Sequence, residues 1–205
     1  MTLKIFETSS TLLEFIKFQD KHKGETYSET FYLLPEGDDS FKDFFDYCDD
    51  CTISPTKQQE FLDSIVIFAN ADGTGGQYGF WLQDGQKNIE NSPIIFFGSE
   101  GFMHIFACNI NELIKILSFG GEGLYGCEAH IYEDDEKEQY FQSFLRRNYN
   151  FNNFREWMTK TLNIEPISNW KTDYSNEVRS LTDKADNKYS KQFDTWLARY
   201  GLESF

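Results

Sequence analysis

The stretch SIVIFANADGTGGQYGFW, residues 64–81, decides the fold class of this chain. Two runs of apolar and aromatic residues flank a segment that contains Gly73, Gly75 and Gly76. Runs rich in β-branched and aromatic residues are typical of strands. Glycine supplies the positive φ angles that a short strand connection needs, and Asn or Asp supports the turn through its side chain. The stretch therefore predicts two strands joined by a short connection.

Three ligand-binding loops resemble the glycine segment, and none of them fits it. A phosphate loop needs a final Gly-Lys-Ser/Thr and a following helix, whereas Gln77 and an aromatic run follow Gly76. A dinucleotide loop also needs a third glycine at a fixed offset and a helix. A calcium loop that starts at Asn70 would place Trp81 where a bidentate Glu is required. We interpret the segment as structural, and a small-ligand loop at Gly73 to Gly76 is the alternative.

Two further runs, 93–98 and 102–108, have the same strand composition. A tight turn over residues 98–101, with Gly98, Glu100 and Gly101, is expected between them. The intervals between consecutive runs are mostly too short for crossover helices, so the strands should pair as antiparallel hairpins.

Helical spacing predicts the remaining elements. The expected helices are one with a Thr11–Glu14 capping box that ends near Gly24, a short one from Asp39 or Ser40 to Cys48, one opened by Ser54-Pro55, one capped by Asn109 or Asn111, and further helices around Tyr140 to Arg147, Trp157 and Trp196. Residues 1–205 are expected to form a single domain, with 165–205 as a helical C-terminal extension.

The net charge of −15 is unevenly distributed along the chain. Residues 1–149 hold 11 Lys and Arg against 26 Asp and Glu, whereas residues 150–205 hold 8 of each kind. Two runs concentrate the excess, EGDDSFKDFFDYCDD at 36–50 and EDDEKE at 133–138. Negative charge disfavours nucleic acid and suits a basic protein partner. The alternative is a solvated surface that promotes solubility.

No window of about 18 apolar residues is present, and the N-terminus lacks the pattern of a secretory signal, so we expect a cytoplasmic protein without a membrane span. In that compartment Cys48, Cys51, Cys108 and Cys127 should remain thiols. His104 and Cys108, with Cys127 and His130, could in principle supply the four nitrogen and sulfur ligands of a zinc ion. His104 and Cys108 should share a face of their strand, whereas Cys127 and His130 should point apart, so no metal or other cofactor is expected.

Catalysis is not expected either. The three histidines, His22, His104 and His130, lie in no recognised nucleophile context, and the sequence GSEG is not a nucleophile elbow.

The order of these elements resembles the SUKH superfamily, which includes fungal regulators of cell-wall glucan synthesis and bacterial immunity proteins that neutralise polymorphic toxins. The resemblance spans roughly residues 30–120. It is carried by Leu34-Pro35 before an acidic run, Asp72-Gly73 before an aromatic strand, PIIFFGSEG at 93–101, and then Ala107, Asn109 and a helix with Leu113, Ile116 and Leu117. An Asn-Gly that often precedes the first strand is absent, and residues 165–205 match no part of the pattern.

The resemblance implies an α+β fold with a mostly antiparallel, or mixed, sheet of about four to six strands flanked by helices. It also implies a non-enzymatic binding protein, either an immunity-type inhibitor of a basic, nuclease-like toxin or a regulatory or scaffold protein linked to glucan synthesis. The residues expected to contact a basic partner are acidic: Asp38, Asp39, Asp43, Asp49, Asp50, Asp72, Glu133, Asp134 and Asp135. The residues expected to form the structural motif are Asp72, Gly73, Gly75, Gly76, Gly98, Glu100 and Gly101.

Overall fold

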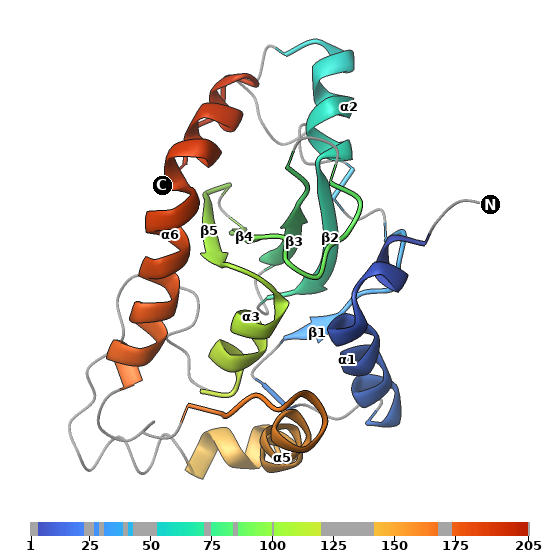
Figure 1. Cartoon of the computed structure of the whole chain (residues 1–205), viewed down its shortest axis with the longest axis vertical. Helices are drawn as coiled ribbons and strands as arrows, with labels where there is room; N and C mark the ends of the chain where they lie inside the picture. The colour runs from blue at the N-terminus through green and yellow to red at the C-terminus, as the bar shows by residue number, and fades with distance from the viewer. Residues whose placement is uncertain are drawn as a thin grey trace.

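The structure is a computed structural model of the whole chain (Figure 1). It describes residues 4–22, 27–28, 31–38, 41–42, 53–71, 75–83, 86–99, 101–119, 142–167 and 174–204.

A five-stranded antiparallel sheet lies at the centre of the fold. The strands are β1 (Tyr32–Leu33), β2 (Ile65–Asn70), β3 (Gln77–Trp81), β4 (Ile94–Phe97) and β5 (Met103–Ala107). Each strand pairs with the next one along the chain, in the order β1-β2-β3-β4-β5. The predicted α+β fold with an antiparallel sheet is therefore confirmed. The sequence did not predict β1, because a two-residue strand is too short to show any periodicity.

The sheet is accompanied by the helices η1 (Ile5–Thr8), α1 (Ser10–Lys21), α2 (Pro55–Asp63), α3 (Ile110–Leu117), α5 (Phe151–Leu162) and α6 (Tyr174–Ala198). Residues 142–147 form a further helical segment before α5. Two predicted caps are confirmed. The Ser54 side chain accepts a hydrogen bond from the Lys57 N–H at the start of α2, and the Asn109 side chain accepts one from the Glu112 N–H at the start of α3.

The predicted start of α1 is wrong by two residues. Ser9, not Thr11, is the N-cap, and its hydroxyl accepts a hydrogen bond from the Leu12 N–H at 3.0 Å. The Thr11 hydroxyl instead donates to the Glu90 carboxylate at 2.6 Å. Glu90 comes from the β3–β4 connection, so a tertiary contact engages the hydroxyl that was expected to cap the helix. The helix ends at Lys21, and the expected stop at Gly24 lies outside the described residues.

One face of the sheet packs against α1, α3 and α5. Tyr78, Phe80, Phe96 and Phe106 point to this side, where they meet the apolar stripe of α3. The stripe consists of Ile110, Leu113, Ile114 and Leu117, which are all fully buried. Phe15 of α1 stacks on Phe31 at 5.6 Å and on Phe154 of α5 at 5.7 Å between ring centroids. We call this side the α3 face.

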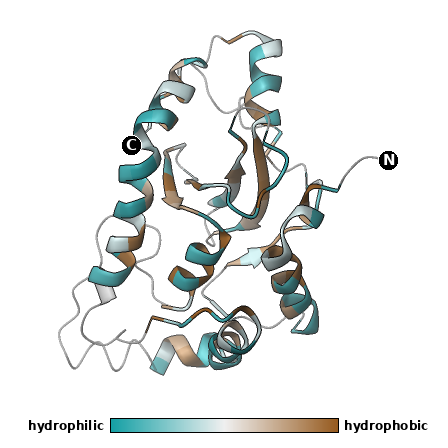
Figure 2. Ribbon diagram, viewed as in Figure 1, coloured by the Kyte–Doolittle hydropathy of each residue, from teal (hydrophilic) through white to brown (hydrophobic). Residues whose placement is uncertain are grey.

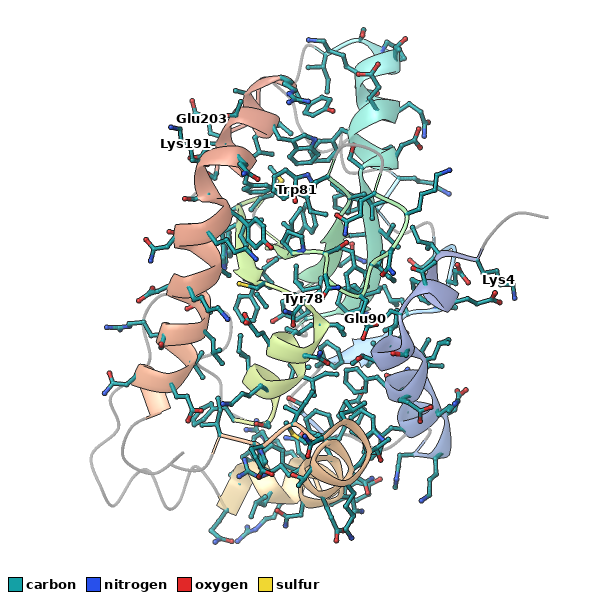
Figure 3. The ribbon with its side chains drawn as sticks, viewed as in Figure 1. Lys4, Tyr78, Trp81, Glu90, Lys191 and Glu203 are labelled. Atoms are coloured by element: carbon teal, nitrogen blue, oxygen red, sulfur yellow. The ribbon has the colours of Figure 1, made fainter. Side chains whose placement is uncertain are left out.

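The opposite face packs against α2 and α6, and we call it the α6 face. Trp81 lies between the sheet and α6, with its ring 5.3 Å from Phe193 and 5.5 Å from Trp196 (Figure 3). Phe61 of α2 stacks on Trp196 at 4.9 Å. Figure 2 shows that the strands are apolar while the outer sides of α2 and α6 are hydrophilic. The segment expected as a C-terminal extension therefore supplies α6, which covers one face of the sheet together with α2.

Arg155 of α5 connects two distant parts of the chain on the α3 face. Its guanidinium donates hydrogen bonds to the carbonyl oxygens of Ser118 and, at 2.9 Å, Ile167. The Ile167 N–H in turn donates to the Ser118 hydroxyl at 3.0 Å. Burial lowers the pKa of Arg155, which nevertheless remains charged because its ordinary pKa is so high. The planar guanidinium can donate to both carbonyls at once, which an ammonium group cannot do with the same geometry.

Gly79 lies in the middle of β3 and provides a sharp test of packing on the α6 face. A Cβ at this position would lie 2.9 Å from Cγ2 of Ile65 and 3.0 Å from Cδ1 of Ile67, and 3.1 Å from the Phe97 ring. We expect Gly79→Ala to lower the free energy of unfolding by about 1–3 kcal/mol, since overpacking forces well-packed neighbours to move. Urea unfolding followed by circular dichroism measures the change. An unchanged midpoint would show that these side chains can move without cost.

The Arg155 contacts predict a second loss of stability. Arg155→Met keeps most of the aliphatic stem and removes the donors, so we expect it to cost about 1.5–3 kcal/mol, as for hydrogen bonds from charged groups. Arg179→Met, at an exposed position of α6, is the matched control and should change stability by less than about 0.5 kcal/mol. Equal effects of the two substitutions in urea unfolding would contradict the structural role of Arg155.

Candidate functional site

The two predicted glycine turns lie next to each other at one end of the sheet. The last pair between β2 and β3 is Asn70 with Gln77, and the last pair between β4 and β5 is Phe97 with Met103. Beyond these pairs, a Cβ at Gly75 would lie only 3.9 Å from Cβ of Ser99. The structure therefore brings the 71–76 loop and the 98–101 turn together, and we call this end of the sheet the glycine end.

The glycines of this end have defined backbone roles. Gly75 has φ of +105° and Gly101 has φ of +86°, a region that other residues rarely adopt. The Gly76 carbonyl accepts a hydrogen bond from the Ala71 N–H at 2.8 Å. A Cβ at Gly98 would lie 2.3 Å from the Phe102 ring, so glycine is needed there for space. Asp72, Gly73 and Glu100 lie outside the described residues.

The chain that leads to Asp38 leaves β1 in the direction away from the 71–76 loop. Leu33 pairs with Ala69, and the Leu34 N–H donates to the Phe68 carbonyl, so the chain after β1 runs along β2 away from the 71–76 loop. The Asp38 N–H then closes a turn onto the Pro35 carbonyl at 3.1 Å. Phe41 follows and packs on the α6 face, 4.6 Å from Phe97 between ring centroids. The other acidic residues expected to contact a partner, Asp39, Asp43, Asp49, Asp50, Glu133, Asp134 and Asp135, lie outside the described residues, as does most of the expected helix ending at Cys48.

The acidic runs that carry most of the net charge lie mainly outside the described residues. The chain has 19 Lys and Arg and 34 Asp and Glu, and the described residues hold 16 of each kind.

The expected relation between His104 and Cys108 is wrong. The His104 ring lies 5.4 Å from Phe96 and 5.9 Å from Phe106, on the α3 face. Cys108 belongs to the cluster on the α6 face. The alternation of the strand fails here because the pairing of β4 with β5 is irregular between Ile94 and Ile95, where β5 supplies one residue more than β4. Cys127 and His130 lie outside the described residues, and within the described ones no group of three or more His, Cys, Asp or Glu side chains could hold a metal ion.

The Cys108 thiol is buried beside a carboxylate and is correspondingly inert. Burial, and then the hydrogen bond and negative charge of Glu112, raise the pKa of Cys108 to about 11. Burial opposes ionisation of Glu112, but its hydrogen bonds with Lys184 and Cys108 outweigh this and lower its pKa. Glu112 accepts the Cys108 N–H at 3.2 Å and pairs with Lys184 of α6. These groups join α3 to α6 and offer no reactive thiolate near neutral pH.

A surface groove between α1 and α5 was not predicted. It has a cavity volume of about 450 Å³ and is lined by ten residues from the two helices and the residue that follows α1. Its lysines and glutamates recur at helical spacing in both segments, and this pattern was visible in the sequence. It could not be recognised as a site because no sequence signal places α1 beside α5.

Comparison with protein-family models, with curated proteins and with solved structures finds no match to this chain. Among the helices of the described residues, none combines the length and the apolar composition that a membrane span requires.

The buried histidine predicts a pH dependence of stability. Burial lowers the pKa of His104 to about 4, from an ordinary value of 6.5. Between these two values the unfolded state binds more protons than the folded state, so stability falls as the pH is lowered from about 6.5. We expect this group to cost about 1.4 kcal/mol at about pH 5.5, relative to about pH 7.5.

The variant His104→Phe removes the titrating group from a ring cluster and isolates this effect. The loss of stability between about pH 7.5 and about pH 5.5, measured by urea unfolding, should be about 1.4 kcal/mol smaller in the variant than in the original chain. The same loss in both proteins would mean that His104 titrates at an ordinary pKa.

Proposed function

We propose that this protein is a non-enzymatic binding protein that recognises a basic protein partner, in the manner of an immunity protein that neutralises a nuclease-like toxin. The observation that carries the proposal is the charge separation. Residues 1–149 hold the whole net charge of −15, concentrated in the acidic runs at 36–50 and 133–138, whereas residues 150–205 are balanced. The resemblance of residues 30–120 to the SUKH superfamily supports the same function, and the proposal includes a cytoplasmic location.

Long-range electrostatics explain why this distribution suits a basic partner. A concentrated negative field accelerates the encounter with a positively charged protein and orients it before contact. Nuclease domains bind phosphate backbones through Lys and Arg, so an acidic surface is complementary to their binding cleft. Two residues attach this part of the chain to the α6 face. Phe41, within the acidic run at 36–50, packs on Phe97 and Phe61, and Ile53, which follows the run, packs on the same face before α2 begins.

Two other functions remain alternatives from the sequence. A regulatory or scaffold protein related to the glucan synthesis regulators would bind endogenous partners, and a large toxin gene beside this gene would favour the immunity role instead. A small-ligand protein would use the loop at Gly73 to Gly76. The described part of that loop favours a structural role, because Gly76 leads directly into β3 and not into a helix.

The test begins with capture of the partner from native cells, followed by measurement of its association rate. We expect Asn substitutions in the acidic run to lower the association rate constant by about tenfold or more at low salt, and by much less at high salt, because salt screens the field. Surface plasmon resonance at two salt concentrations measures both effects. The substituted residues are Asp38, Asp39, Asp43, Asp49 and Asp50.

A matched control removes the same number of negative charges from exposed positions elsewhere on the scaffold. The amide variants at Glu60, Glu165, Asp183, Asp186 and Glu203 serve this purpose. If the two sets of variants lower the rate equally, the effect comes from net charge alone and the acidic run is not the binding surface. If neither set changes the rate or its salt dependence, the electrostatic proposal is wrong.

A further inference from the structure

The groove between α1 and α5 has the form of a seat for a third helix. Figure 1 shows the end of α1 next to α5, and aromatic contacts join the two helices at the floor of the groove. Each helix has 12 residues and is therefore about 18 Å long. The lining residues follow the i, i+3, i+4, i+7, i+8 pattern of a single helical stripe in both segments: Glu14, Lys17, Phe18, Lys21 and His22, and Asn153, Glu156, Trp157, Lys160 and Thr161.

The floor of the groove is aromatic. The rings of Phe18 and Trp157 lie 4.8 Å apart between centroids, and Phe15 stacks on Trp157 from below at 5.4 Å. Phe18 is buried, whereas Trp157 is partly exposed. The indole thus presents apolar surface to the groove on a support of packed rings. An apolar side chain of a partner would be buried against a floor that needs no rearrangement.

The rims of the groove carry more positive than negative charge. Both glutamates are already paired within their own helices, Glu14 with Lys17 at 2.6 Å and Glu156 with Lys160. Lys21 has no ion pair with any described residue. Lysines occur on both sides, Lys17 and Lys21 on α1 and Lys160 on α5, in a chain whose net charge is −15.

We infer that this groove binds an amphipathic helix from an acidic partner protein. Two helices that each present a stripe of residues over an aromatic floor match the helix-in-groove mode of recognition. The apolar face of the bound helix would cover Trp157, and acidic residues on its two flanks would lie near Lys21 and Lys160. This surface differs in sign from the acidic segments of the proposed function, so it would serve a different partner.

The first part of the test uses three fluorescently labelled peptides and the full chain. One is an 18-residue amphipathic helix of Glu and Leu, the second is its scrambled sequence, and the third carries Lys in place of Glu. We expect the acidic amphipathic helix to bind about tenfold or more tightly than either of the others in fluorescence anisotropy. Equal binding of the Lys peptide, or no saturable binding of the acidic helix up to about 1 mM, would overturn the inference.

The second part places the peptide in the groove. The double variant Lys21→Glu and Lys160→Glu should weaken binding of the acidic helix by about tenfold or more. The matched control, Lys87→Glu with Lys191→Glu, makes the same change of charge at exposed positions outside the groove and should weaken it by less than about twofold. Equal weakening by both pairs would mean non-specific attraction and would contradict the site.

Two further readouts separate the alternatives. Sedimentation of the unliganded chain tests whether a second copy occupies the groove, because a dimer that only the groove variant abolishes would assign the groove to self-association and overturn the inference. Binding of the basic partner should be unchanged in the groove variant. A failure of the groove is thus distinguishable from a failure of the proposed function.

Discussion

The structure depends on the burial of a small sheet on both faces. Every residue of β4 is buried, and so is every residue of β3 after Gln77. An antiparallel sheet can leave one face in water, but one whose strands are apolar on both sides cannot. Helices must therefore cover both faces, and no single local segment of the chain supplies enough of them. The α3 face is covered by α1, α3 and α5, and the α6 face is covered by α2 and by the last helix of the chain. The two ends of the sequence thus cover opposite faces of the same sheet.

The central elements could be predicted from the sequence because their signals are local. Strands β2 to β5 are short runs of β-branched and aromatic residues between turn residues, and α3 combines a capping Asn with a continuous apolar stripe. The features that the sequence did not predict depend on contacts between distant parts of the chain. The hydroxyl of Ser9 caps α1, while the hydroxyl of Thr11 donates to Glu90 of a distant connection. His104 and Cys108 lie on opposite faces because β5 has one extra residue where its pairing with β4 is irregular. The covering role of α6 was also hidden, since its buried residues Ala185, Tyr189, Phe193 and Trp196 are spread thinly along a hydrophilic helix.

The candidate site shows the same division. The glycine turns could be located from the sequence, since a strand connection has composition requirements that do not depend on the rest of the fold. Their closeness could not, because the distance between Gly75 and Ser99 depends on the order of the strands. Charge is a special case. The sequence alone shows that the acidic runs at 36–50 and 133–138 hold most of the negative excess, and most of these residues lie outside the described ones.

Charge that is concentrated in short runs differs physically from charge that is spread evenly over a protein. Evenly spread excess charge repels itself across the folded domain and reduces its stability, whereas a concentrated field attracts and orients a partner of opposite sign. The described ion pairs that join elements, Lys115 with Glu177 and Lys184 with Glu112, connect α3 to α6 and act within the scaffold. Within the α1–α5 groove, Lys17 and Lys160 pair with Glu14 and Glu156 of their own helices, so Lys21 is the lysine of the lining that has no ion pair with a described residue. The lining therefore holds one more lysine than carboxylate, in a chain whose net charge is −15.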